Sequence, residues 1–348
     1  MAKEITIYDI AAALQLSPAT VSRGLNDHPA INSLTKQAIQ AKANELGYRF
    51  NKFASNLRKQ KTNTIGVIVP RLNSYLMSTV LAGMEKVANE EGFNLLISQS
   101  LELQKKEVTN ALTMFNSRVD GLLVSVAYDT DSFEHFELFI HKKIPLIFFD
   151  RVVEHNLCTS IVIDNAKAGY EATQHLIQQG RTQILHVTGS LKRNVYADRL
   201  KGYQLALLDA GIAYNPDLVV VSDLSIESGR VLAQRIKTQM PRSDGIFITN
   251  DLCAVSCISA LQELGISVPE DISVVGFNND PVAQVISPAL TTIHYPGREM
   301  GEIAAKSMIN HLNGNLTIDA TNTIVLKSEL MVRNSSVVIT EKIDRLAR

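Results

Sequence analysis

Residues 16–26, LSPATVSRGLN, decide how the N-terminal part of this chain folds. Ser17 can accept a hydrogen bond from a free backbone N–H at a helix start, and Pro18 at the first helical position loses no hydrogen bond. Val21 and Leu25 lie one helical turn apart, so they would share an inward face. The stretch predicts a short helix that ends near Asn26.

We expect one helix before this stretch and one after it. Thr6 can cap the first, and Gln15 and Leu16 make a tight turn into the second. The third begins near Asn32 or Ser33 and stops at Gly47, a residue type that often ends helices in a left-handed conformation. The apolar residues expected inside are Ile7, Ile10, Ala11 and Leu14 of the first helix, and Leu34, Ala38, Ile39 and Leu46 of the third.

The outward side of the second helix has the chemistry of a DNA-reading surface. Its residues are Ser17, Ala19, Thr20, Ser22 and Arg23. Hydroxyls suit phosphates, alanine suits a thymine methyl group and a guanidinium suits guanine. Two short helices joined by so few residues cross steeply, which presents the second to a major groove. A three-helix bundle without any ligand is the alternative that composition alone leaves open.

Charge is divided unevenly along the chain. The 348 residues carry a net charge of −1, but residues 1–60 hold eight Lys and Arg against four Asp and Glu, while the remainder holds 26 against 31. A net charge of +4 on the first part and −5 on the rest is typical of a small phosphate-binding head on an acidic body. The bias alone is weak evidence, because charged residues often form only a solvated face.

Composition excludes several classes of protein. No apolar run approaches the roughly 18 residues of a membrane-spanning helix, and residues 1–10 lack the apolar stretch of a secretory signal. A cytoplasmic location is therefore expected. Cys253 and Cys257 lie one helical turn apart and fit buried thiols, since no second Cys or His pair completes a metal site. No cofactor is expected.

From residue 64 onward, short β-branched runs alternate with amphipathic stretches. Near-continuous apolar strands separated by helices indicate parallel sheets covered on both faces, and the length favours two sheets, hence two lobes with a cleft. The expected strands are Ile65–Val69, Asn94–Ser98, Gly121–Val126, Pro145–Phe149, Ile161–Ile163, Ile184–Val187, Gly245–Ile248 and Ile272–Val275.

Polar residues follow many of these strands, and they would line the cleft. They include residues 70–75, Asp150-Arg151, Asp164-Asn165, Asn250-Asp251 and Asn278-Asn279-Asp280. Carboxylates and amides there can form paired hydrogen bonds with a hydroxyl-rich ligand. Several could simply cap the following helices, and for Asp164 capping is as good an explanation as binding. His175, among apolar residues, is expected to be structural.

The first sixty residues resemble the head-piece of the lactose-repressor (LacI/GalR) family. The matching segments are TIYDIA from Thr6, LSPATVSR from Leu16, Leu25-Asn26, and Leu46-Gly47-Tyr48 followed by Asn51. The resemblance implies that Pro18, Ala19 and Arg23 contact bases, while Tyr8, Ser17, Thr20 and Ser22 hold phosphates. Thr6 and Asn26 complete the predicted DNA-binding set within the head. Two residues depart from the family pattern: Gln15 replaces a turn glycine, and Phe50 replaces a proline before the hinge.

Residues 51–61 would form a hinge between head and body. The family match implies a short helix in which Leu57 wedges into a minor groove, with Lys52 and Arg58 also at the DNA. A helix this short is marginal in isolation, so it should order only with a partner helix and DNA. The alternative is an unstructured basic linker.

The resemblance continues through the body and implies a fold similar to periplasmic sugar-binding proteins. Among the matching segments are residues 65–70, 144–151, 199–203, 268–277 and 290–293. The effector-binding residues that it implies are Asn73, Tyr75 and Asp150 on one side of the cleft and Arg199, Asn250 and Asn278 on the other. The usual aspartate at Asn278 has lost its charge, and Ser74-Tyr75 replaces a proline-phenylalanine pair, so the ligand can differ from the family norm.

These observations predict a DNA-binding transcriptional regulator, expected to repress carbohydrate-related genes under the control of a small molecule, a sugar or sugar derivative. The domains would be residues 1–50 (helix-turn-helix), 51–61 (hinge) and 62–348, with a first lobe at about 62–163 and 294–322 and a second at about 164–293 and 323–340. A homodimer on a palindromic operator is expected. The rival classes are a transport solute-binding protein, which would need a signal peptide, and an enzyme, for which no nucleophile, phosphate-loop or metal pattern is present.

Overall fold

The computed structural model of the protein describes residues 5–48, 61–153, 158–240, 243–315 and 323–337. The chain separates into two compact units at residue 62, a small head and a large body. No helix within the described ranges combines the length and apolar character needed to cross a lipid bilayer.

The head consists of the three expected helices, α1 (Ile7–Leu14), α2 (Pro18–Leu25) and α3 (Ser33–Glu45). Its core contains Ile10, Ala11, Val21, Ile39 and Ala43. The expectation that Leu34 and Ala38 are buried is wrong, because Leu34 is 79 % exposed and Ala38 is exposed as well. At about 100° per residue, Ile39, Ala43 and Leu46 form one inward stripe along α3, and Leu34 and Ala38 lie outside it.

Each helix of the head begins at the cap that the sequence predicts. The backbone N–H of Thr6 donates to the Asp9 carboxylate at 2.8 Å. Ser17 Oγ accepts the N–H of Thr20 at 3.0 Å, and Asn32 Oδ1 accepts that of Thr35 at 2.8 Å. These caps satisfy N–H groups that have no partner inside the helix, which fixes where each helix starts.

Gln15 ends α1 in the left-handed conformation, with φ 57° and ψ 36°. A side chain costs energy in this region of backbone space and glycine does not. We expect Gln15→Gly to stabilise the head by up to about 1 kcal/mol, measured as slower hydrogen exchange of the α1 and α2 amides. Gln37→Gly, in the middle of α3, is the control and should lose about 1 kcal/mol. Equal destabilisation by both variants would contradict the explanation.

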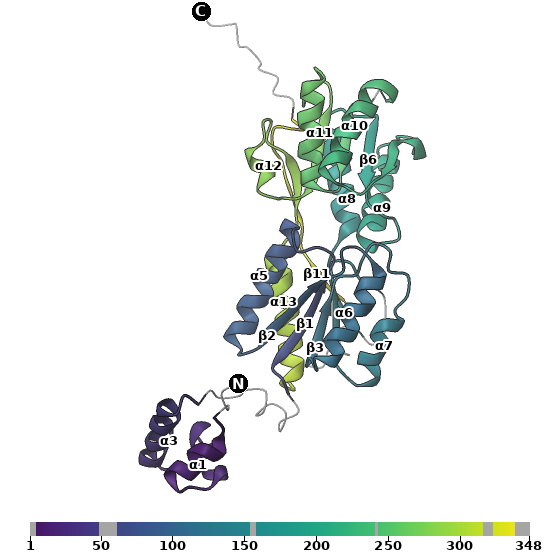
Figure 1. The fold of residues 1–348 in the computed structure, drawn as a ribbon. Coiled ribbons are helices and arrows are strands. Elements are labelled where there is room, and N and C mark those ends of the chain that lie inside the picture. Colours follow the sequence, from purple (N-terminus) through teal and green to yellow (C-terminus); the bar gives the residue numbers. More distant parts are fainter. Residues whose placement is uncertain (1–4, 49–60, 154–157, 241–242, 316–322, 338–348) are drawn as a thin grey trace, which may run out of the picture. The chain divides into compact units, whose positions relative to one another are not determined.

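The first lobe of the body is built on a sheet of six parallel strands in the order β11-β5-β4-β3-β1-β2. Helices α5 and α13 cover one face, and α6 and α7 cover the other (Figure 1). The strands are β1 (Thr64–Val69), β2 (Asn94–Gln99), β3 (Gly121–Val124), β4 (Leu146–Phe149), β5 (Thr159–Ile163) and β11 (Thr323–Leu326). The helices are α5 (Tyr75–Glu90), α6 (Gln104–Asn116), α7 (Glu134–His141) and α13 (Gly297–Leu312).

The second lobe repeats this plan with the order β12-β10-β9-β8-β6-β7, in which only the β10–β12 pair is antiparallel. Helices α8 and α9 pack on one face, and α10 and α11 on the other. The strands are β6 (Ile184–Thr188), β7 (Val219–Val221), β8 (Gly245–Ile248), β9 (Ser273–Asn278), β10 (Thr291–His294) and β12 (Glu329–Met331). The helices are α8 (Asn165–Gln178), α9 (Asn194–Asp209), α10 (Ile226–Gln239), α11 (Asp251–Glu263) and the short α12 (Val282–Val285), with a 3₁₀ turn at Pro216–Leu218.

The prediction of two parallel sheets covered on both faces is confirmed, and all eight expected strands are present. The expected lobe boundary at residue 323 needs a correction. Strand β11 pairs with β5 along Thr323–Leu326 and so belongs to the first lobe. The chain returns to the second lobe only after Leu326, because this strand completes the edge of the first sheet.

In each lobe two helices cross at a reciprocal pair of glycines. On α5 and α13, a Cβ at Gly83 would lie 2.1 Å from the carbonyl oxygen of Arg298, and one at Gly301 would lie 1.9 Å from that of Val80. On α8 and α9, Gly169 and Gly202 make the same kind of approach. The two backbones therefore touch where any other residue would separate them.

The two cysteines and the histidine that the sequence assigns to the core are buried. Cys253 and Cys257 lie on the buried side of α11, and burial raises the pKa of the Cys253 thiol to about 12. His175 shares a hydrogen bond of 2.7 Å with Ser336 Oγ, and burial lowers its pKa. Within the described ranges, no three His, Cys, Asp or Glu side chains gather closely enough to hold a metal ion.

Candidate functional site

The head presents α2 as an exposed ridge. The buried Val21 anchors it, while Ala19 and Arg23 point into solvent. Tyr8, 68 % exposed, lies on the neighbouring α1. The predicted DNA contacts on or beside these two helices are Thr6, Tyr8, Ser17, Pro18, Ala19, Thr20, Ser22, Arg23 and Asn26, and none lies in the core. The predicted contacts Lys52, Leu57 and Arg58 fall outside the described residues.

Local hydrogen bonds hold several of these side chains in place. Ser17 Oγ lies 2.8 Å from Thr20 Oγ1, and Asn26 Nδ2 donates to the Ser22 carbonyl at 2.7 Å. The hydroxyls of Ser17 and Thr20 thus gather at the N-terminus of α2, where backbone N–H groups and the helix dipole favour an anion. A phosphate of a DNA backbone fits this end of the helix.

Arg23 differs from the other basic side chains of the described head. Lys36 pairs with Asp27 at 2.6 Å, and Lys42 pairs with Glu45 at 2.6 Å. Arg23 has no ion-pair partner among residues 5–48. Its guanidinium is therefore free to donate two hydrogen bonds to a base edge, as guanine recognition requires.

A cavity of about 380 Å³ lies between the two lobes of the body. All six residues that the sequence assigns to the effector line it: Asn73, Tyr75, Asp150, Arg199, Asn250 and Asn278. They come from loops and helix starts that follow the strands of both sheets. The structure thus brings together residues that are up to about two hundred positions apart in the chain, as expected for the carboxyl ends of parallel strands.

Arg199 forms part of the second-lobe wall and is 4 % exposed. Its Nε donates to Asn165 Oδ1 at 2.9 Å and its Nη1 to the Thr249 carbonyl at 3.3 Å, while its guanidinium lies 3.6 Å from the centre of the Phe277 ring. Burial lowers the pKa of Arg199. The guanidinium is held rigidly with no carboxylate bonded to it among the described residues, so it can bind a ligand oxygen.

Asp150 forms part of the opposite wall. It is 4 % exposed, and its carboxylate accepts hydrogen bonds from Tyr295 at 2.9 Å and from Ser125 at 3.3 Å. Its backbone is left-handed at φ 58°, which turns the chain at the end of β4. Asp150 is thus oriented by both lobes, because Tyr295 follows β10 of the second sheet.

An aromatic and ionic cluster also lines the cavity, and residue types alone did not predict its arrangement. The Arg151 guanidinium bonds Glu102 at 2.7 Å and lies 4.2 Å from the centre of the Tyr128 ring. The Tyr128 and Tyr196 hydroxyls lie 2.8 Å apart and join the two lobes. Burial raises the pKa of Tyr128, so the hydroxyl stays neutral and able to donate.

Asp164 and Asn250 each follow a strand, and each could either cap the next helix or bind the effector. Asp164 caps α8 by accepting the Lys167 N–H at 2.9 Å and is not among the residues that line the cavity. Asn250 caps α11 by accepting the Cys253 N–H at 3.1 Å and also lines the cavity. Capping therefore accounts for Asp164, whereas Asn250 can serve both purposes.

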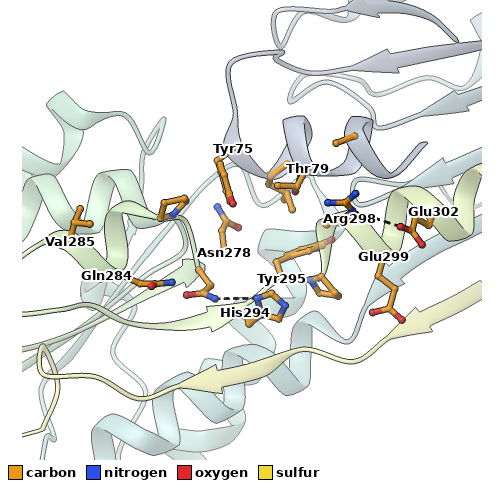
Figure 2. Close-up of a pocket in the computed structure, with 16 residues that line it drawn as sticks. Tyr75, Thr79, Asn278, Gln284, Val285, His294, Tyr295, Arg298, Glu299 and Glu302 are labelled. Atoms are coloured by element: carbon orange, nitrogen blue, oxygen red, sulfur yellow. Dashed lines mark hydrogen bonds and ion pairs between the residues drawn. The ribbon is translucent and has the colours of Figure 1, made fainter. Parts of the chain in front are cut away.

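A second cavity, of about 730 Å³, adjoins the first around the start of α5 and α13 (Figure 2). Tyr75 and Asn278 line both cavities. Val285, 81 % exposed, lies at its margin on α12.

A helix-turn-helix head joined to a two-lobed body with a polar cleft defines a ligand-responsive DNA-binding regulator. Residues 6–51 match the model of bacterial regulatory proteins of the lacI family, and residues 173–336 match that of a periplasmic binding protein-like domain. The ribose operon repressor of Haemophilus influenzae is 31 % identical over 331 residues, covering 95 % of this chain and 98 % of the relative. The chain belongs to the LacI family of bacterial transcription regulators.

Solved structures share the fold. A lac repressor dimer bound to operator and the anti-inducer ONPF matches with a TM-score of 0.86 at 24 % identity, covering 97 % of this chain and all of the other. The regulator CelR in complex with cellobiose matches with a TM-score of 0.72 at 26 % identity, covering 95 % of this chain and all of the other. Both matches cover residues of the head and residues of the body.

Proposed function

We propose that this regulator represses carbohydrate-related genes by binding a palindromic operator as a homodimer, and that a sugar or sugar derivative in the cleft controls this binding. The observation that carries the proposal is the presence in one chain of an unpaired Arg23 on an exposed ridge and of a cleft lined by six polar effector candidates. One relative is named as a ribose operon repressor, and a similar solved structure is a complex with cellobiose, which supports a sugar as effector. A protein that acts on operator DNA works in the cytoplasm.

The two lobes provide the means of control. A ligand that bonds Asp150 in one wall and Arg199 in the other is bound best at one separation of the walls, so it shifts the population toward that arrangement. Two heads on a two-fold axis would contact two half-sites, and the second cavity around Tyr75 and Val285 is our candidate for part of the contact between copies.

Selection of bound duplexes from a random pool, followed by footprinting, tests the DNA part of the proposal. An inverted repeat is the expected result, and equal affinity for every duplex would overturn it. A thermal-shift screen of sugars, sugar acids and sugar phosphates tests the effector part, with each hit assayed for its effect on operator affinity. Turnover of a sugar by the purified protein would favour an enzyme instead.

A further inference from the structure

Asp280 places an unpartnered carboxylate in the wall of the cleft. The residue lies two positions after the end of β9, lines the same cavity as Asn278, and is 4 % exposed. Its Oδ1 atom is buried and has no hydrogen-bond partner, and no cation of the described chain forms an ion pair with it. Buried carboxylates without a partner are rare, because the lost hydration is not replaced.

The backbone before Asp280 brings it back to the cleft. Asn278 has φ 117° and Asn279 has φ 58°, so two successive residues adopt conformations that reverse the chain just beyond the strand. Asn279 is held there by Arg333, which donates to its Oδ1 at 2.7 Å, and by His294, whose Nδ1 lies 3.2 Å from its Nδ2. Asparagine tolerates such conformations better than most residues.

A second carboxylate fixes the position of Asp280 without satisfying it. Asp251 Oδ2 accepts the backbone N–H of Asp280 at 2.8 Å, and Asp251 Oδ1 accepts the Thr292 hydroxyl at 2.7 Å. Asp251 is therefore a structural group that links α11, the Asp280 turn and β10. Burial first, and the charge of Asp251 second, raise the pKa of Asp280 to about 7.

We infer that Asp280 accepts hydrogen bonds from hydroxyls of the effector and so supplies the carboxylate that Asn278 lacks. The inference rests on the proposed function and deepens it, since it concerns the ligand of the same cleft. Arg71, Arg151 and Arg199 share the cavity wall with four carboxylates, so the charges nearly balance and favour neither an ammonium group nor an anion. The ligand class is therefore a neutral polyhydroxyl compound.

The first test needs no ligand. A ligand-binding residue that has no hydrogen-bond partner in the free protein destabilises the fold, so replacing it should raise the stability. At pH 8, where Asp280 is ionised, we expect Asp280→Asn to raise the melting temperature of the body by about 2–4 °C. Asp251→Asn, which loses accepted hydrogen bonds, should lower it. A fall for Asp280→Asn as large as that for Asp251→Asn would make Asp280 a structural residue and overturn the inference.

The second test uses ribose, glucose, cellobiose and glucosamine as probes in calorimetric titrations of the full chain. For the neutral sugar that binds wild type, Asp280→Asn should weaken binding about tenfold. The control Asp164→Asn removes the same charge at a residue that caps α8 and does not line the cavity, and asparagine can cap equally well, so affinity should not change. Unchanged affinity in Asp280→Asn, or preference of wild type for glucosamine, would overturn the inference.

A failure of the proposed regulatory function can be distinguished from a failure of the inference on Asp280. If wild type selects no operator, or no probe alters operator binding, the regulatory proposal fails. The melting temperatures of Asp280→Asn and Asp251→Asn still decide whether Asp280 has a structural or a recognition role.

Discussion

Replacing Arg23 with alanine is expected to cost about 1–3 kcal/mol of operator binding and to relax the preference for one base pair in each half-site. The reason is geometric. Arg23 lies on the exposed side of α2, and neither Asp27 nor Glu45 competes for its guanidinium, since each is bonded to a lysine. Binding assays with the selected operator and with single-base variants of it measure both effects.

Lys42→Ala is the matched control, because it removes the same charge from the same small unit at a site on α3. A general loss of electrostatic attraction would weaken operator and unrelated duplexes alike in this variant. If Arg23→Ala also reduced binding uniformly over all duplexes, its assignment as a base-contacting residue would be wrong.

The largest effect on stability is expected for Gly301→Ala. The added Cβ would lie 1.9 Å from the Val80 carbonyl oxygen and 3.0 Å from the Met84 nitrogen. Both atoms are helix backbone, so α5 and α13 must move apart along much of their contact. We expect a loss of about 3 kcal/mol or more in the free energy of unfolding, measured by urea denaturation.

Asn310→Ala, on an exposed position of α13, tests whether the helix tolerates substitution in general. Its expected effect lies within about 0.5 kcal/mol of zero. A similar small effect for Gly301→Ala would show that the two helices are not held by close backbone approach.

The head could be predicted almost completely because its signals are local. Ser17 and Pro18 define the start of α2, and Gly47, at φ 70°, adopts the predicted left-handed conformation just beyond the end of α3. Leu34 shows the limit of this reasoning. An apolar residue near a helix start was assumed to be buried, whereas the inward stripe is set by Ile39 and Ala43. Composition does not fix the phase of a helix.

The body illustrates what depends on distant residues. Apolar runs such as Gly245–Ile248 predict strands by themselves, but β11 and the three-residue β7 and β12 were not among the expected strands. Such short strands exist because a neighbouring strand offers hydrogen bonds, and sequence alone does not show which neighbour that is. The same cause explains the misplaced lobe boundary at residue 323.

The sequence predicted which residues line the cleft but not how they contact one another. The rule that polar residues gather beyond parallel strands placed Asp150, Asn250 and Asn278 at one cavity, whereas Arg199, within α9, was expected only from the family resemblance. Which of these polar side chains bind one another is a matter of rotamers and backbone reversals. The left-handed pair Asn278 and Asn279, which returns Asp280 to the wall, has no signal in residue type beyond the tolerance of asparagine.

The position of β11 and α13 bears on the order in which a nascent chain can fold. The first sheet obtains its edge strand from Thr323–Leu326, and its α5 face obtains a covering helix from Gly297–Leu312. A ribosome delivers these segments after the whole second sheet except β12. The head can fold early during translation, whereas the first lobe must wait, with part of one face of its sheet uncovered, until Leu326 has emerged.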